Sequence, residues 1–384
     1  MNGRFVARLR RFLPGVFFLA LLQTADAANL WDGEEVRMGA GYPFIAKFIA
    51  ADRDAPLVVF IPGARSLARI AYGGHEGGLD EDFLAYWLNR EGYNFLGISY
   101  PVLTDDGAFD EAHPGITVRA WGYGSAEITK AVMEEQGLTG PVIVAVWSMG
   151  GKSVQPYAEA AAELGIDLDF HVSLASTPPL PNAGNMNARI AMHESGLGLR
   201  PDGAAAAVSA LAANATENGR SEIIPPEILN SQYIGHWPVQ LTGTGLRYDG
   251  QLHTIYRDHW ADMQDTKFYA LDFPLVAMIV PGQDDPRHAV MDRATWGYIN
   301  ANTLFFGYAG GEQQTRNLPE DRFDKLRDLA RDAHSRLAID IGGNHFFFVG
   351  EKGARETVAA IRELEERVHQ LKADLTAIGA GAAH

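Results

Sequence analysis

Short, continuous apolar runs recur along the chain, and each is bounded by glycine, proline or polar residues. They are rich in branched and aromatic residues and lack the strict apolar–polar alternation of a half-exposed strand. Runs of this kind are typical of strands that are buried on both faces of a parallel sheet. The strands predicted in this way cover residues 56–61, 93–100, 142–147, 168–174, 274–280 and 337–341.

Helical spacing separates several of these runs. In residues 80–90 and 152–164, apolar side chains recur every three or four positions, which predicts amphipathic helices. Because strands and helices alternate over most of the chain, we expect an α/β fold with a doubly wound, mostly parallel sheet.

One long gap breaks this alternation, between the strand that ends near Ser176 and the strand that begins at Pro274. The gap opens with a cluster of prolines and is far longer than an ordinary connection between a strand and a helix. We therefore predict that residues 178–270 form an inserted cap or lid together with the missing crossover helix. Residues 28–177 and 271–384 would then form the core.

The first residues have the pattern of an export signal. Several arginines precede an apolar run at residues 12–22, and Ala25 and Ala27 form a small-x-small cleavage site. The run is too short to span a bilayer, and no cysteine follows it that could carry a lipid. We predict that residues 1–27 are a signal peptide, that the protein is periplasmic or secreted, and that it has no stable membrane anchor.

Composition narrows the possible functions. The chain has 384 residues, with 32 Lys and Arg against 48 Asp and Glu, a formal net charge of −16 and no cysteine. The acidic balance disfavours binding to phosphate backbones, so we expect no nucleic-acid partner. The lack of cysteine excludes disulfides, thiolate nucleophiles and cysteine-based metal sites. We expect no cofactor, and also no metal, because no His-Glu-x-x-His or comparable cluster occurs.

The most specific motif lies where the strand at 142–147 ends. The strand leads directly into Ser148, Met149 and two glycines, and a helical pattern follows. This order resembles the nucleophile elbow of the α/β-hydrolase superfamily, whose pattern is Gly-x-Ser-x-Gly. Gly150 matches the second glycine. Val146 stands in place of the first, and its branched side chain is expected to open the turn slightly.

The resemblance implies a catalytic triad in the chain order serine, acid, histidine, with each residue after a strand. The loops that follow residues 274–280 and 337–341 fit this order. By resemblance, Ser148 is the nucleophile, His345 is the general base and Asp285 is the acid that orients the histidine. Asp285 has the usual spacing from Gly282, and the neighbouring Asp284 is the alternative acid.

The resemblance also implies an oxyanion hole made of two backbone N–H groups. Met149, the residue after the nucleophile, would supply one. The loop after residues 56–61 would supply the other, from Ala64 or else from Arg65. The Arg65 side chain is either a contact for an acidic group of the substrate or a solvated loop residue.

Together these residues predict a serine hydrolase that cleaves a carboxylic ester, small or lipid-like, through an acyl-enzyme. Hydrolysis of an amide, thioester or lactone, or acyl transfer, is the alternative on the same triad. A non-catalytic, hydrolase-like binding protein is the alternative of another class. A phosphate-binding loop is suggested by Gly151-Lys152-Ser153 but disfavoured, because that motif requires a glycine where Val146 stands.

The last helical stretch carries apolar residues at alternating spacings of three and four. This pattern predicts either a terminal helix that packs on the sheet or the seam of a homodimer, and packing on the sheet is favoured. The residues concerned are Ile361, Leu364, Val368, Leu371, Leu375 and Ile378.

Overall fold

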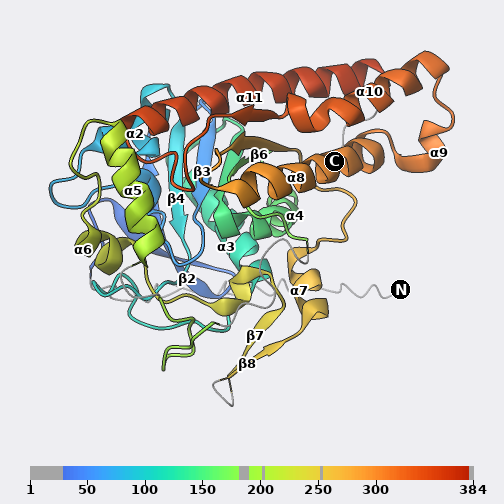
Figure 1. Cartoon of the computed structure of the whole chain (residues 1–384). Coiled ribbons are helices and arrows are strands. Elements are labelled where there is room, and N and C mark those ends of the chain that lie inside the picture. Colours follow the sequence, from blue (N-terminus) through green and yellow to red (C-terminus); the bar gives the residue numbers. More distant parts are fainter. Residues whose placement is uncertain (1–28, 181–189, 201–203, 251–253, 380–384) are drawn as a thin grey trace, which may run out of the picture.

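The protein is built around one eight-stranded sheet in the order β1-β2-β4-β3-β5-β6-β9-β10 (Figure 1). The computed structural model describes residues 29–180, 190–200, 204–250 and 254–379, so the predicted signal peptide lies outside the described residues. Strand β2 is antiparallel to β1 and β4, and the remaining pairs are parallel. With helices on both faces, this arrangement confirms the predicted α/β class.

The predicted apolar runs form the parallel part of the sheet. Strands β3, β4, β5 and β9 are buried at every residue, which is why their sequences do not alternate. The parallel strands are β3 (Leu57–Ile61), β4 (Asn94–Ser99), β5 (Val142–Trp147), β6 (Leu168–Leu174), β9 (Val276–Val280) and β10 (Ala338–Asp340).

An N-terminal hairpin, which the apolar runs did not predict, forms one edge of the sheet. Strands β1 (Glu34–Gly39) and β2 (Tyr42–Ile49) pair in antiparallel register around a turn at Ala40 and Gly41. Strand β1 is mostly polar, and the apolar run of β2 is cut short by Lys47, so neither has the long buried run of the parallel strands.

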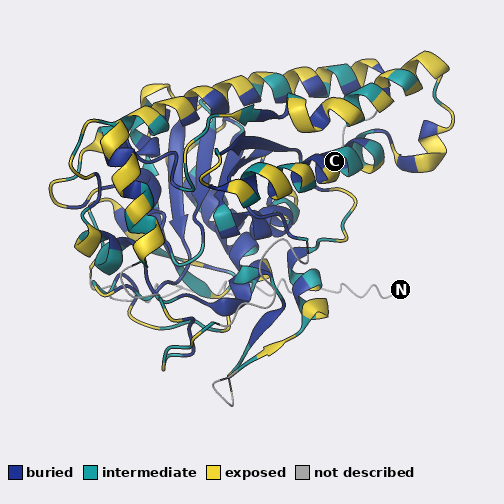
Figure 2. Ribbon diagram, in the orientation of Figure 1, coloured by how far each residue is buried: buried dark blue, intermediate teal, exposed yellow. Residues whose placement is uncertain are grey.

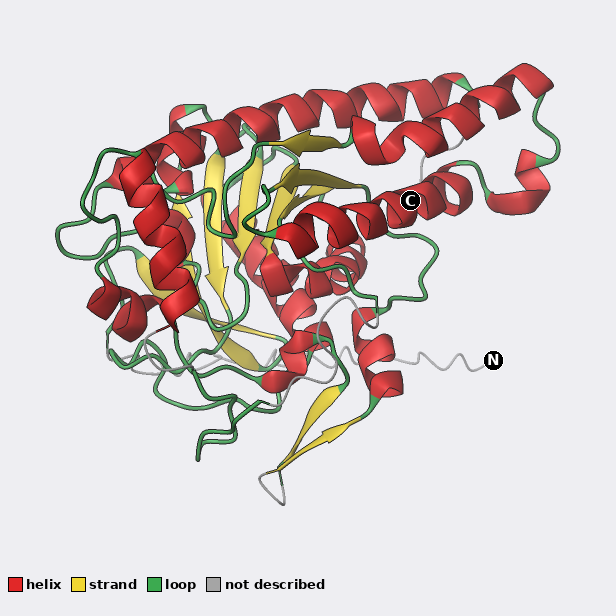
Figure 3. Ribbon diagram, in the orientation of Figure 1, coloured by secondary structure: helices red, strands yellow, loops and turns green. Residues whose placement is uncertain are grey.

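Helices cover the two faces of the sheet (Figure 3). Helix α2 packs against α11 on one side, and α3, α4 and α7 pack together on the other. Figure 2 shows the strands buried and the outer faces of the helices exposed. These elements are α1 (Arg69–Tyr72), α2 (Leu84–Arg90), α3 (Val118–Gln136), α4 (Val154–Leu164), α7 (His259–Thr266) and α11 (Glu351–Ala377).

Segment 178–270, predicted as cap and crossover helix, supplies several short elements. Helix α7 packs against α3 and α4, which is the place of a crossover helix. Helix α5 (Ala205–Glu217) lies over the end of the sheet near α2, and the hairpin of β7 and β8 extends away from the sheet (Figure 1). The other elements are α6 (Pro226–Ile228), η4 (Leu229–Tyr233), η5 (Val239–Thr242), β7 (Leu246–Asp249) and β8 (Thr254–Arg257).

A second long excursion joins β9 to β10, and the sequence pattern did not predict it. Its helices α8 and α10 pack against each other, and together with α11 they extend beyond the sheet (Figure 1). The elements of this arm are η6 (His288–Asp292), α8 (Arg293–Asn302), η7 (Thr303–Tyr308), α9 (Gly311–Thr315) and α10 (Glu320–Arg336).

The apolar seam of the last helix is covered within the chain. Ile361, Leu364, Val368, Leu371 and Leu375 are fully buried, because α11 packs on α2, α10, β9 and β10. A homodimer through this helix, which remains a prediction, would have to use its exposed face. Among the described residues, no helix combines the length and the apolar character needed to cross a membrane.

Candidate active site

Ser148 sits on a sharp turn between β5 and the helical turn η2 (Ser148–Ser153). Its φ of 52° lies in the left-handed region, which a side chain with a Cβ rarely adopts. Two glycines make this turn possible. A Cβ on Gly150 would lie 2.8 Å from the carbonyl oxygen of Ile61, and one on Gly151 would lie 2.4 Å from that of Thr177. The serine is therefore held in the strained geometry of a nucleophile elbow.

Val146 does not open the elbow as expected. It is fully buried in β5 and keeps regular register with Ile61 of β3 and Ser173 of β6. The position therefore accommodates a branched side chain, and the left-handed conformation of Ser148 is kept.

Asp285 and His345 meet at the carboxyl ends of two adjacent strands. Asp285 follows β9, His345 follows β10, and Nδ1 of His345 lies 2.6 Å from Oδ2 of Asp285. The two loops are also joined by their backbones, because the Gly282 amide donates to the carbonyl of Gly343 at 2.8 Å. Asp284 is exposed and takes no part in this contact. The histidine therefore contacts Asp285 rather than the alternative acid.

A second histidine holds the other oxygen of the same carboxylate. Nδ1 of His288 lies 2.6 Å from Oδ1 of Asp285, and its ring stacks on His345 with centroids 4.6 Å apart. Burial by itself raises the pKa of Asp285, but the hydrogen bonds from His288 and His345 outweigh it and hold that pKa well below its usual range. Burial lowers the pKa of His288 to about 4, so this imidazole is neutral at pH 7.

The sequence interpretation missed His288. The available signal was its position three residues after Asp285 at the start of a helical segment, where one turn brings the two side chains together.

Ser148 and His345 line one cavity of about 420 Å³. Trp147 links them, because its indole N–H donates to the carbonyl of His345 at 3.0 Å and its ring packs against the imidazole. Within the described part of the chain, Ser148 Oγ makes no hydrogen bond, and such catalytic contacts often tighten only when substrate binds. The other lining residues are Ala64, Arg65, Ser66, Ala204, Ala205, Ala206, Ala207, Ile234 and Phe346.

The loop after β3 passes directly over the nucleophile. A Cβ on Gly63 would lie 2.7 Å from Cβ of Ser148, so only glycine allows this approach. The Tyr100 hydroxyl donates to the carbonyl of Gly63 at 3.0 Å, which ties this loop to the residue that follows β4. The second oxyanion donor, Ala64 or else Arg65, belongs to this loop and remains a prediction. Met149 lies in the first turn of η2, where amides lack an acceptor within the helix.

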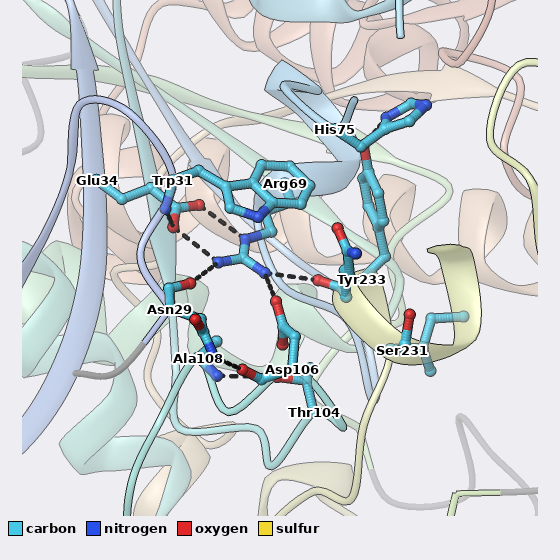
Figure 4. A network of polar contacts seen from close by, with 12 residues as sticks. Asn29, Trp31, Glu34, Arg69, His75, Thr104, Asp106, Ala108, Ser231 and Tyr233 are labelled. Atoms are coloured by element: carbon cyan, nitrogen blue, oxygen red, sulfur yellow. Dashed lines mark hydrogen bonds and ion pairs between the residues drawn. The ribbon is translucent and has the colours of Figure 1, made fainter. Parts of the chain in front are cut away.

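The same loop continues into a buried polar network around Arg69 (Figure 4). The guanidinium pairs with Glu34 at 2.8 Å and Asp106 at 2.7 Å, and donates to the carbonyl of Gln232 at 2.9 Å. The ring of Trp31 lies 4.0 Å from it. The loop after β3 is therefore tied to the first described residues, to the loop after β4 and to the inserted segment.

Helix α5 of the inserted segment holds the His345 loop. The buried amide of Asn214 donates to the carbonyls of Phe346 at 2.8 Å and Val349 at 2.9 Å. Asn344 in turn donates to Oδ1 of Asn214 at 2.8 Å. The residues that precede Asn214 on the same helix line the cavity, so α5 both shapes the pocket and positions the histidine.

Two clusters among the described residues have the atom spacing of a metal site. In the first, Asp285, His288 and His345, both imidazole Nδ1 atoms lie in hydrogen bonds to the carboxylate. The second cluster consists of Asp169, Glu365 and His369. Its Asp169 carboxylate is paired with Lys372, whose Nζ lies 2.6 Å from Oδ1. Hydrogen bonds and an ion pair therefore account for both groupings.

The phosphate-loop interpretation is not supported by the position of Lys152. Its side chain is fully buried, with the aliphatic part against Gly243, and its ammonium group faces the carbonyl of Leu180 at 3.4 Å. A lysine in this position does not reach a phosphate in the cavity.

No family model and no curated protein matches the sequence. Solved structures show distant likeness. A thermophilic esterase from Thermogutta terrifontis has a TM-score of 0.44 and 11% identity over 87% of this chain and 99% of its own. A bacterial heroin esterase has a TM-score of 0.40 and 13% identity, over 91% of this chain and 87% of its own. A third structure is an enzyme variant in complex with its substrate, the Pseudomonas quinolone signal, whose ring it cleaves. It has a TM-score of 0.44 and 14% identity, over 86% of this chain and 99% of its own.

These likenesses are too distant to assign a function, and the proteins act on unlike substrates. The chain's own topology identifies its fold. A serine on a strained strand-to-helix turn, an acid after a later strand and a histidine after the last strand, in that order, are the arrangement of the α/β-hydrolase fold.

Proposed function

We propose that this protein is a serine hydrolase that cleaves a carboxylic ester through an acyl-enzyme, with Ser148, His345 and Asp285 as its triad. The observation that carries the proposal is the 2.6 Å contact between His345 and Asp285 beside a serine with a φ of 52° in the same cavity. Hydrolysis of an amide, thioester or lactone, and acyl transfer, are open to the same residues.

The contact with Asp285 sets the proton positions. A carboxylate acceptor requires the proton of His345 on Nδ1, which leaves Nε2 free to act as the base. Nε2 removes the proton of Ser148 as Oγ attacks the ester carbonyl carbon. The amides of Met149 and Ala64 stabilise the oxyanion that forms. Asp285 stabilises the imidazolium, and its low pKa keeps it ionised throughout.

The intermediate collapses when the bond to the alcohol breaks and His345 returns its proton to the leaving oxygen. Water then enters, His345 takes its proton, and the hydroxide attacks the acyl-enzyme. The second tetrahedral intermediate collapses when the bond between its carbon and Oγ of Ser148 breaks, His345 returns its proton to Oγ, and the carboxylic acid leaves.

Labelling with a fluorophosphonate tests the proposal directly. The wild-type protein should be labelled on Ser148 and should release the phenol of a chromogenic ester in a burst, whereas Ser148→Ala should do neither. Ser195→Ala, at a serine outside the cavity, is the matched control. An unlabelled wild type, or equal labelling of Ser148→Ala, would favour the alternative of a non-catalytic binding protein.

Export is proposed on the sequence pattern of residues 1–27 alone. Mass spectrometry of the protein recovered from periplasm and medium should find a mature chain that begins near Ala28. Recovery of the uncleaved chain in the cytosol would contradict export.

A further inference from the structure

Among the described residues that line the cavity of Ser148, Arg65 is the one arginine. Arg65 follows Ala64 in the loop after β3 and lines the same cavity as Ser148 and His345. Its φ of 67° places a residue with a side chain in the left-handed region, and its carbonyl accepts a hydrogen bond from Gly235 at 2.8 Å. Strained residues of this kind concentrate at ligand sites, because the surrounding structure must hold them.

Among the described residues, the Arg65 side chain has an aromatic neighbour but no ion-pair partner. Its guanidinium carbon lies 4.9 Å from the ring centre of Trp237, and within the described part of the chain it makes no ion pair and no hydrogen bond. Two arginines that are buried, unlike the partly exposed Arg65, are paired: Arg69 with Glu34 and Arg247 with Asp265. Burial lowers the pKa of Arg65, which reflects the cost of a charge without a counterion.

The rest of the cavity is mostly apolar. Trp147, Phe346, Ile234 and the alanines of α5 line it, and they supply no charge that could neutralise the guanidinium. The whole chain carries −16, so its overall field disfavours an anionic ligand. An unpaired arginine beside the nucleophile provides the local attraction that such a ligand would need.

We propose that Arg65 binds a carboxylate of the substrate, so that the enzyme prefers esters with a free carboxylate on their acyl or alcohol part. The inference rests on the proposed function. The planar guanidinium matches a carboxylate with two parallel hydrogen bonds. Because Arg65 adjoins the proposed oxyanion donor Ala64, that carboxylate would lie only a few atoms from the scissile carbonyl.

Two pairs of esters of equal length test the proposal on the full chain. Monomethyl glutarate and methyl pentanoate differ by a carboxylate at the end of the acyl part. 4-Acetoxybutanoate and butyl acetate differ in the same way at the alcohol part. In at least one pair, wild-type kcat/KM should favour the carboxylate ester by roughly tenfold or more, as expected for hydrogen bonds to a charged group.

Arg65→Gln should lower that ratio by about tenfold, and Arg65→Lys should retain part of it, because it keeps the charge but loses the planar fork. Arg316→Gln removes an exposed positive charge just after α9 and should leave the ratio unchanged. Circular dichroism and fluorophosphonate labelling of each variant check the fold and the nucleophile.

The outcomes separate this inference from the proposed function. If wild type is labelled on Ser148 but Arg65→Gln keeps the wild-type ratio in both pairs, the carboxylate site is wrong and the hydrolase stands. If wild type is not labelled at all, the proposed function fails first, and the inference fails with it.

Discussion

The Asp285 carboxylate has two imidazole partners, and only one of them faces the cavity. His345 lines the cavity, whereas His288 is buried behind it and holds the second oxygen of the acid. His288 is thus a positioning residue that fixes the carboxylate for the residue that reacts. A carboxylate held at both oxygens cannot rotate away from His345.

We predict that His288→Leu lowers kcat about tenfold, because Asp285 loses one of its two donors and its fixed orientation. His288→Asn keeps an N–H donor near the position of Nδ1 and should recover most of the rate. Steady-state kinetics over pH 5 to 9 measure both. If the two variants lose kcat equally, His288 acts by filling space rather than by positioning Asp285.

Gly63 sets the distance between the oxyanion loop and the nucleophile. A Cβ at this position would lie 2.7 Å from Cβ of Ser148, so Gly63→Ala should displace the loop and lower kcat by about a hundredfold. Gly115→Ala is the matched control, since its added Cβ meets nothing closer than a tyrosine oxygen at 3.9 Å. Normal burst kinetics in Gly63→Ala would show that the loop does not supply a donor.

At the scale of elements, helix α5 acts on the site through one amide. We predict that Asn214→Leu removes one donor from the carbonyl of Phe346, which keeps the Val349 amide, and one from the carbonyl of Val349, and lowers the free energy of unfolding by about 2 kcal/mol. Because these carbonyls flank the His345 loop, kcat should fall as well. Urea unfolding and kinetics measure the two effects.

Thr216→Ala, on the exposed side of the same helix, should change neither quantity. A stable Asn214→Leu with full activity would show that α5 only covers the cavity.

The elements that could be predicted share one physical property, which is burial on both faces. Strand β5 was predicted with its observed bounds, because all of its residues are apolar and buried. Strands β1 and β2 were missed because β1 is mostly polar and only three consecutive residues of β2 are buried. Ser148, Asp285 and His345 could be proposed from the sequence for the same reason, because each lies in a loop that follows a predicted strand. The Asp285–His288 contact depends on side-chain orientation, which spacing alone does not decide.

At the scale of the whole molecule, Arg69 joins parts of the chain that are far apart in sequence. Arg69→Met leaves Glu34 buried without a counterion, so we expect a loss of about 3–5 kcal/mol in the free energy of unfolding. The double variant with Glu34→Gln should recover much of this loss. Arg37→Met removes a pair with the half-exposed Glu135 and should change stability by less than about 1 kcal/mol. Chemical denaturation measures the free energy of unfolding of Arg69→Met, the double variant and Arg37→Met. Equal losses in all three would show that burial of the Arg69 pair does not matter.

Lys152 makes stability depend on pH in the alkaline range. Burial lowers its pKa from 10.5 to about 8, so the folded state holds this proton less tightly than the unfolded chain. The charge therefore lowers the free energy of unfolding by about 3 kcal/mol below pH 8, and the penalty disappears as the pH rises to 10.5. Lys152→Met should be more stable than wild type at pH 7 and equal to it near pH 10.5.

Asp262 and Asp292 offset part of this gain. Burial raises the pKa of both carboxyl groups, and the charge of Lys152 counteracts that rise. Lys352→Met, at an exposed lysine, is the control and should show no such trend in urea unfolding. A stability difference that stays constant from pH 7 to 10.5 would rule out the charge of Lys152 as its cause.

We expect the Arg69 network to form late in folding. One of its hydrogen bonds joins residues separated by 163 positions, so it forms only after a very long loop has closed. The hydrogen bonds within helices join residues that are close in sequence, so the helices should form first. During refolding, helical circular dichroism should therefore recover ahead of ester hydrolysis, because the loop over Ser148 gains its supports last.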